Sequence, residues 1–277
     1  MTRALAGLLC LAFALGACAD GRDARSHAAR IAAAAGLNRM EIRAGTFDLV
    51  AYARFGAAPV LRVYIEGDGH AWASRDMPSE DPTPWTPVAL ELAAMDPAAS
   101  VAYLARPCQY GVPGSALGCG AVYWTVGRYG EAVVAGMNTA VDRLLALSGA
   151  RSLELVGFSG GGSVAALIAA RRRDVASLRT VATNLDTKAW TERLGLSPLT
   201  ESQNPAAFAD RLQDIPQMHF GGAMDSVVDA AILQAFVARF AVRSCVNSEL
   251  IAGVGHAEGW PAVWPVLLRR PVRCAVP

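Results

Sequence analysis

The sequence predicts an α/β protein with a doubly wound, mostly parallel sheet, and three observations lead to that fold class. Apolar stretches typical of strands alternate with stretches typical of helices, which places helices on both faces of a parallel sheet. The length of 277 residues suits one large domain. With 53% hydrophobic residues, the chain can also form a sizeable core.

The first elements are separated by proline-rich and glycine-rich loops. Residues 46–55 alternate apolar with polar or small side chains, which is the pattern of a half-buried strand. A helix is predicted over 131–149, where apolar residues share one face and Gly149 marks the end. The other elements expected here are a short helix over 29–37, strands over 58–67 and 100–106, a helix over 86–96, and loops over 68–87 and 107–130.

The second half of the chain repeats a strand–helix alternation. A strand over 152–158 is followed by a helix over 161–173, which is the most regular pair in the sequence. The remaining predicted elements are strands over 178–186, 215–225 and 248–256, and helices over 229–240 and 260–270. This order is typical of successive βα units in one parallel sheet.

The N-terminus has the features of an export signal. Arg3 precedes an apolar run over 4–17 that is too short to span a membrane, so residues 1–17 are interpreted as a signal peptide. Leu-Gly-Ala-Cys at 15–18 resembles a bacterial lipobox, which predicts cleavage before Cys18 and its lipidation. Ordinary cleavage, with Cys18 incidental, is the alternative. Because alanine rather than aspartate follows Cys18, we expect attachment to the outer membrane, facing the periplasm. Residues 18–38 then form an anchor linker and short helix, and 39–277 the domain.

Four cysteines remain after the signal peptide and Cys18 are set aside. In an oxidising compartment an even number suggests disulfides, and of the three possible pairings we expect Cys108–Cys119 and Cys245–Cys274, each bracketing one loop region. A zinc site is less favoured, because the sequence has no C-x-x-C motif and no histidine at ligand spacing from a cysteine. A formal net charge of +1 argues against a nucleic-acid partner.

A glycine-flanked serine follows the strand over 152–158. Residues 157–161, Gly-Phe-Ser-Gly-Gly, match the motif G-x-S-x-G between a predicted strand and a predicted helix. In that setting the serine occupies a sharp turn with its hydroxyl exposed, and the helix N-terminus offers free N–H groups to a developing negative charge. The pattern predicts that Ser159 is a nucleophile. A plain Gly-Ser turn is the alternative.

An activated serine needs a base, and the base needs an orienting acid. His256 ends the last predicted strand, and Asp225 follows the strand before it. We expect these two residues to serve Ser159, with Asp186 as the rival acid. Asp229 is better explained as a helix N-cap. The other histidines, His27, His70 and His219, precede the sheet, lie in a loop, or lie within a strand.

The order Ser159, Asp225, His256 at three strand ends resembles the α/β-hydrolase superfamily over residues 40–270. The resemblance implies an eight-stranded, mostly parallel sheet, with Ser159 as nucleophile, His256 as base and then acid, Asp225 as orienter, and no metal or organic cofactor. The segments YIEGDGHAW, RPCQY, WTVGRYG and GFSGGG also resemble bacterial hydrolase lipoproteins to which no substrate is assigned.

The same resemblance places an oxyanion hole at two loops. One donor is expected to be the N–H of Gly160, and the second the N–H of Asp68, with Gly69 close behind. Glu66 and Asp68 bring two carboxylates to that place, which is unfavourable unless they are paired, and Arg106 or Arg128 is available to pair them. A plain glycine-rich turn is the alternative.

The substrate class follows from the superfamily rather than from single residues. The segment 187–213 is too short for a large lid, so we expect a minimal cap and a small-to-medium ester, thioester or other acyl substrate. Four tryptophans are candidates for an acyl pocket or for the core: Trp72, Trp124, Trp190 and Trp260. A non-catalytic, acyl-binding envelope lipoprotein and a serine peptidase on the same fold remain alternatives.

Overall fold

The structure is a computed structural model that describes residues 23–111 and 118–275. The predicted signal peptide and Cys18 lie outside the described residues. Within the described ranges, none of the helices has both the length and the apolar character that a membrane crossing requires.

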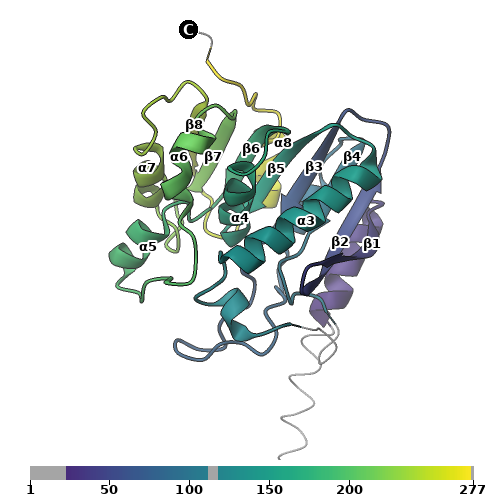
Figure 1. The fold of residues 1–277 in the computed structure, drawn as a ribbon, viewed down its shortest axis with the longest axis horizontal. Coiled ribbons are helices and arrows are strands. Elements are labelled where there is room, and N and C mark those ends of the chain that lie inside the picture. The colour runs from purple at the N-terminus through teal and green to yellow at the C-terminus, as the bar shows by residue number, and fades with distance from the viewer. Residues whose placement is uncertain (1–22, 112–117, 276–277) are drawn as a thin grey trace, which may run out of the picture.

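Eight strands form one open sheet, which confirms the predicted fold class (Figure 1). Their order across the sheet is β1-β2-β4-β3-β5-β6-β7-β8. Strand β2 runs antiparallel to β1 and β4, and every other neighbouring pair is parallel. The strands are β1 Asn38–Ala44, β2 Phe47–Phe55, β3 Val60–Ile65, β4 Ser100–Leu104, β5 Ser152–Phe158, β6 Val175–Val181, β7 Gln217–Gly222 and β8 Val246–Ile251.

Helices cover both faces of this sheet. In Figure 1, α3 and α4 cross in front of the strands and α8 lies behind them. Residues 23–34 are also helical and pack on the same face as α2 and α8. The helices are α2 Val88–Ala94, α3 Glu131–Ser148, α4 Gly160–Ala169, α5 Thr187–Leu194, α6 Ala209–Leu212, α7 Ala230–Val237 and α8 Trp260–Leu267, with 3₁₀ turns at Ala121–Trp124 and Pro205–Phe208.

The hydrophobic pattern of α3 explains its position. Val133, Met137, Val141 and Leu144 are all fully buried, and they face the sheet in the larger of two core clusters. The helix ends at Gly149, which has a φ of 69° that glycine adopts at little cost. The predicted apolar face and the predicted end are therefore both present.

Several boundaries differ from the predictions. The last strand, predicted to end at His256, is β8, which ends at Ile251, so His256 lies in the loop after it. Strand β1 was not predicted, because its sequence Asn-Arg-Met-Glu-Ile-Arg-Ala is highly charged, as suits an exposed edge strand. The strand predicted over 178–186 is β6, which ends at Val181 because Ala182 has a left-handed φ of 49°. The short helix predicted over 29–37 instead covers 23–34.

The topology brings four loops to one edge of the sheet. Strands β3, β5, β7 and β8 are mutually parallel, so their carboxyl ends share that edge. In open α/β sheets this edge is where ligands bind. The loops that follow these strands carry Asp68, Ser159, Asp225 and His256.

Candidate active site

Ser159 occupies a strained turn between β5 and α4. Its φ of 49° and ψ of −126° are rarely adopted by a residue with a side chain. Glycine on either side makes the turn feasible, since a Cβ at Gly157 would lie 2.3 Å from the Cα of Gly162, and one at Gly161 would lie 2.2 Å from the carbonyl oxygen of Ile65. The strained backbone thus lies at the serine that lines the cleft described below.

Two hydrogen bonds connect Ser159 to His256 and His256 to Asp225. The Oγ of Ser159 lies 3.0 Å from Nε2 of His256, and Nδ1 of His256 lies 2.9 Å from Oδ2 of Asp225. The Asp225 side chain is fully buried, and its Oδ1 accepts the backbone N–H groups of Val227 and Val228, both at 2.8 Å. The structure therefore brings the three residues together in the order that a nucleophile, its base and an orienting acid require.

The loop that carries His256 is held from below by α8. The indole N–H of Trp260 donates to the carbonyl oxygen of His256 at 2.8 Å, and Trp260 itself is completely buried. The Phe158 ring lies beside the imidazole, with 5.6 Å between ring centroids. These contacts fix the imidazole while leaving about a fifth of its surface exposed.

The rival acid Asp186 has a structural position instead. Its Oδ1 accepts the N–H of Ala189 at 3.2 Å and a bond from Asn204 at 2.9 Å, so it caps α5. Its Oδ2 pairs with Arg239 at 3.0 Å. Asp229 likewise caps α7 through the N–H of Ala231. Neither carboxylate contacts His256.

The other histidines lie apart from Ser159. His219 is completely buried in β7 and bonds the Thr180 hydroxyl at 2.8 Å, and burial lowers the pKa of its imidazole to about 3. His27 belongs to the N-terminal helix. His70 stacks on Trp85 with 4.2 Å between ring centroids, at the edge of the cleft described below.

Three side chains hold Asp68 in the loop after β3. Its Oδ1 lies 3.1 Å from Nη1 of Arg106, and its Oδ2 lies 2.8 Å from Nη1 of Arg128 and 3.2 Å from the hydroxyl of Tyr129. Burial alone would raise the pKa of Asp68, but the charges of Arg128 and Arg106 outweigh it and hold the pKa below its ordinary value. We refer to these four residues as the Asp68 cluster.

The Asp68 cluster presses directly on the turn that carries the serine. A Cβ built on Gly160 would lie 2.0 Å from Oδ1 of Asp68, so only glycine fits there. The carboxylate therefore packs on the first residue of α4. This contact fixes the loop after β3 relative to Ser159.

Glu66 is held differently from Asp68. Its Oε1 accepts the N–H of Gly67 at 2.8 Å and that of Ala89 at 3.4 Å, and no arginine among the described residues pairs with it. Burial raises the pKa of Glu66 to about 7. The expectation that Arg106 or Arg128 neutralises the acids therefore describes Asp68, which both arginines contact, and not Glu66.

Three backbone N–H groups next to Ser159 have no acceptor. In residues 23–111 and 118–275, no hydrogen bond is formed by the N–H of Asp68, Gly69 or Gly160, whereas that of Gly67 is taken by Glu66. Asp68 and Gly69 line the same cleft as Ser159, and Gly160 follows it in the chain. These are the donors that the sequence predicted for an oxyanion.

A disulfide-bracketed segment supports the loop after β3. Gln109 donates to the carbonyl oxygen of Gly67 at 3.0 Å and accepts the N–H of Arg106 at 3.0 Å. Cys108 between them is bonded to Cys119. Gln109 and Tyr129 were not predicted to belong to the site, because neither residue type nor local pattern distinguishes them in the sequence.

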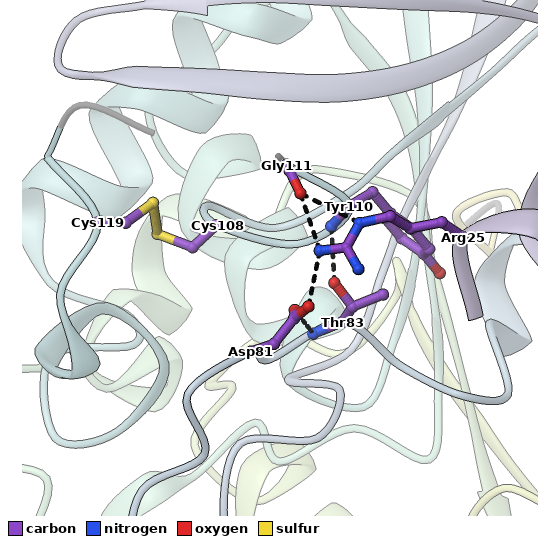
Figure 2. Close-up of a disulfide and its surroundings, with 7 residues drawn as sticks. All are labelled: Arg25, Asp81, Thr83, Cys108, Tyr110, Gly111 and Cys119. Carbon is purple, nitrogen blue, oxygen red and sulfur yellow. Dashed lines mark hydrogen bonds and ion pairs between the residues drawn. A yellow bond between two sulfur atoms is a disulfide. The ribbon is translucent and has the colours of Figure 1, made fainter. Parts of the chain in front are cut away.

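Figure 2 shows how the same segment reaches the N-terminal helix. Arg25 donates to the carbonyl oxygen of Gly111 at 2.8 Å and pairs with Asp81 at 2.7 Å, and Tyr110 donates its N–H to the hydroxyl of Thr83 at 2.8 Å. The second disulfide, Cys245–Cys274, joins the residue before β8 to the C-terminal segment after α8. Both predicted pairings are thus present.

An open cleft of about 900 Å³ leads to Ser159. Trp72 and Trp190 line it, as does Trp85, which was not among the predicted pocket residues. Trp124 and Trp260 do not line it, and both are buried in the core. Further apolar lining includes Val126, Leu196, Leu199, Val227 and Val228.

The cap over this cleft is small. It consists of α5 and the segment up to the 3₁₀ turn Pro205–Phe208, as the sequence predicted. The indole N–H of Trp190 on α5 donates to the carbonyl oxygen of Val227 at 2.7 Å, which fixes the cap to the loop after β7. Ser159 therefore stays accessible from solvent.

Solved structures with a similar fold are numerous, although no family model and no curated protein sequence matches the chain. An α/β serine hydrolase homologue from Coxiella burnetii is 19% identical, with a TM-score of 0.57 over 83% of this chain and 92% of that one. An α/β serine hydrolase without a lid from Xanthomonas campestris is 14% identical, with a TM-score of 0.55 over 87% and 97%.

A putative lipase from Acinetobacter baumannii is 13% identical, with a TM-score of 0.58 over 89% of this chain and 93% of that one. At such identities the likeness concerns the fold. Together with the sheet order and the strand–turn–helix around Ser159, these structures show that the chain has the fold of the α/β-hydrolase superfamily.

Proposed function

We propose that the protein is a serine hydrolase that cleaves carboxylic esters or thioesters through an acyl-enzyme on Ser159. The observation that carries the proposal is the continuous hydrogen-bonded chain from Ser159 through His256 to Asp225, which opens onto the cleft. A strained serine of this kind is costly to a fold and is expected where its hydroxyl reacts.

The mechanism follows from the geometry of the three residues. His256 takes the proton of the Ser159 hydroxyl as the oxygen attacks the acyl carbonyl carbon, and it then protonates the leaving alcohol or thiol. Asp225 stays ionised and stabilises the imidazolium through Nδ1. Water then attacks the acyl-enzyme with His256 again as base, which releases the acid and restores the serine.

The negative charge on the carbonyl oxygen needs donors that are already in place. The N–H groups of Gly160 and Asp68 supply them in this proposal, with Gly69 beside Asp68. The Asp68 cluster supports the assignment, because it fixes the Asp68 backbone against Gly160 before any substrate binds. Removing one such donor typically costs ~10²–10³-fold in rate.

An ester is favoured over a peptide as the substrate. The cleft is open, and Trp190 and Leu196 give it an apolar lining. Two of the similar structures carry descriptions in keeping with this, one a putative lipase and the other a serine hydrolase without a lid. A small-to-medium acyl group fits a cleft of this size.

Export and lipid anchoring at Cys18 complete the proposal. The two disulfides support an oxidising compartment, and the lipobox-like residues 15–18 support an anchor in the outer membrane facing the periplasm. Replacing Cys18 by alanine tests this part: wild type should be cleaved before Cys18 and carry acyl groups there, and the variant should have neither this N-terminus nor the acyl mass. A variant with the N-terminus and mass modification of wild type would contradict the anchor.

A fluorophosphonate, which reacts only with activated serines, tests the catalytic part. The full chain, produced in an oxidising compartment, should gain one adduct by intact mass, and Ser159→Ala should gain none. Ser74→Ala is the matched control, because Ser74 lines the same cleft without a histidine partner and should leave labelling unchanged. A folded wild-type protein without an adduct would support the acyl-binding alternative instead.

A further inference from the structure

Arg128 has more hydrogen-bond donors than the protein uses. A guanidinium carries five N–H groups in a fixed plane. Nε donates to the carbonyl oxygen of Thr125 at 2.6 Å, Nη1 donates to Asp68 at 2.8 Å, and the Tyr129 hydroxyl lies close enough to take one more bond. Among the described residues, that leaves two of the five N–H groups without an acceptor.

The spare donors of Arg128 face the cleft rather than the interior. The Arg128 side chain is only 9% exposed, yet it lines the cleft that contains Ser159. None of its nitrogens belongs to the buried atoms that lack a partner, whereas Nε of the neighbouring Arg106 does. Arg106 does not line the cleft. Of the two arginines that hold Asp68, Arg106 is therefore enclosed, and Arg128 faces the cleft in which a substrate would bind.

The charge at this place is positive. Asp68 neutralises one of the two arginines, which leaves one positive charge in the Asp68 cluster. The only other charged residues that line the cleft among those described are Arg75 and Asp76, whose charges are opposite, and Glu66. Burial raises the pKa of Glu66 to about 7, so Glu66 is neutral below that pH and then adds no negative charge to the cleft. A partly desolvated, pre-oriented guanidinium of this kind favours carboxylate or phosphate oxygens.

From these contacts we infer that Arg128 binds an anionic group of the substrate, and that the enzyme prefers esters carrying a carboxylate or phosphate near the scissile bond. The inference rests on the proposed function and adds the substrate class to it. The Asp68 carboxylate contacts both Arg128 and Gly160. The proposed anion site is therefore close to the N–H groups that would bind the oxyanion. The apolar wall at Trp190, Leu196 and Leu199 takes the rest of the acyl group.

Matched pairs of chromogenic esters test the preference. The 4-nitrophenyl monoester of glutaric acid is compared with 4-nitrophenyl valerate, which has the same chain length without the charge. A second pair, 4-acetoxyphenyl phosphate and phenyl acetate, places the anion on the leaving group. Wild type should prefer the anionic member of one pair, and which pair responds tells on which side of the ester the anion lies.

Arg128→Gln should lower kcat/KM for the preferred anionic ester about 10- to 100-fold more than for its neutral partner, mainly through KM. Arg128→Lys should retain part of the preference, because the charge remains and the fork is lost. Arg75→Gln is the control, an exposed arginine at the edge of the same cleft, and should change both esters equally. Equal losses on charged and neutral esters in Arg128→Gln would overturn the inference.

A measurement on wild type alone separates this inference from the proposed function. Glutarate should slow fluorophosphonate labelling of Ser159, and the uncharged glutaramide should not. Labelling that both compounds leave unaffected would overturn the anionic site while leaving the hydrolase intact. Absence of any labelling would instead overturn the proposed function. The same measurement decides the inference if Arg128→Gln does not fold.

Discussion

On the side of Ser159 that faces His256, two hydrogen bonds connect three residues, each from a loop that directly follows a strand. On the side that faces Asp68, the contacts come from more distant parts of the chain. Arg106 follows β4, Arg128 and Tyr129 precede α3, and a disulfide holds the segment between them. The first group therefore lies on loops that follow parallel strands, and the second brings together loops that are far apart in the sequence.

This difference separates two tasks. The hydrogen-bonded chain moves a proton, so it needs one partly exposed imidazole at a defined distance from Ser159. The Asp68 cluster has to hold backbone N–H groups still, which takes buried, charge-assisted bonds on loops that strands do not fix. Substitutions in the hydrogen-bonded chain from Ser159 to Asp225 should therefore change mainly the rate. Substitutions in the Asp68 cluster should change both the rate and the free energy of unfolding.

The largest effect is expected from Asp225→Asn. The amide cannot stabilise an imidazolium and favours the wrong tautomer of His256, so kcat on an ester should fall ~10⁴-fold with little loss of fold. Asp186→Asn is the matched control, a fully buried carboxylate that caps α5, the helix after the neighbouring strand β6, and pairs with Arg239. It should retain kcat within a small factor. The reverse result would make Asp186 the acid.

Asp68→Asn should change both rate and stability. The amide leaves the charges of Arg106 and Arg128 uncompensated in a buried place, which is expected to cost about 3 kcal/mol of unfolding free energy. The loop after β3 would then shift from Gly160, and kcat should fall ~10²-fold. Urea unfolding and initial rates on a neutral ester measure the two effects.

A control for Asp68 exists at the other edge of the sheet. Asp96 has a fully buried side chain that pairs with Arg62 at 2.6 Å and accepts a bond from the Tyr64 hydroxyl at 2.7 Å. Asp96→Asn should lose similar stability without losing kcat. If both variants lose the same rate at a temperature where they are folded, the Asp68 cluster has no special role in catalysis.

The sequence predicted Ser159, Asp225 and His256 because the signals for these residues are local. Ser159 lies in a motif between a strand and a helix, and Asp225 and His256 follow the last two strands. The mostly parallel sheet, the apolar face of α3 and the cysteine pairs also followed from local patterns. The short cap could be inferred from the number of residues between β6 and β7.

The Asp68 side was predicted only in part, because its contacts are long-range. The sequence indicated that Arg106 or Arg128 would pair with an acid of the loop after β3. Which carboxylate the arginines contact, Glu66 or Asp68, depends on how the loop is buried in the fold. Gln109 and Tyr129 act through single bonds to residues more than 40 positions away. Such pairs leave no periodic or spacing signal in one sequence.

The two disulfides offer a comparison within one molecule. Replacing Cys108 and Cys119 by serine should cost about 3 kcal/mol of unfolding free energy through the unfolded chain, and replacing Cys245 and Cys274 should cost about the same. Only the first pair holds the segment with Arg106 and Gln109, so only its loss should also lower kcat, by several-fold and less than in Asp68→Asn. Equal rates in the two double variants at equal folded fractions would contradict the link.

The smallest effect on rate is expected at Glu66, whose raised pKa makes the stability of the protein depend on pH. Burial raises the pKa of Glu66 from 4.5 to about 7, so the folded state favours the protonated acid. The stabilising contribution is therefore fully present below pH 4.5 and is lost as the pH rises through 7, for a total of roughly 3 kcal/mol.

Glu66→Gln cannot titrate, yet its amide oxygen can still accept the N–H of Gly67. The variant should thus gain stability relative to wild type as the pH rises from 4.5 to 8 in urea unfolding, with kcat on a neutral ester little changed. A difference between the two proteins that stays constant with pH would mean that Glu66 is ionised throughout, and the burial beside Tyr103 and Tyr110 would then need a compensating donor.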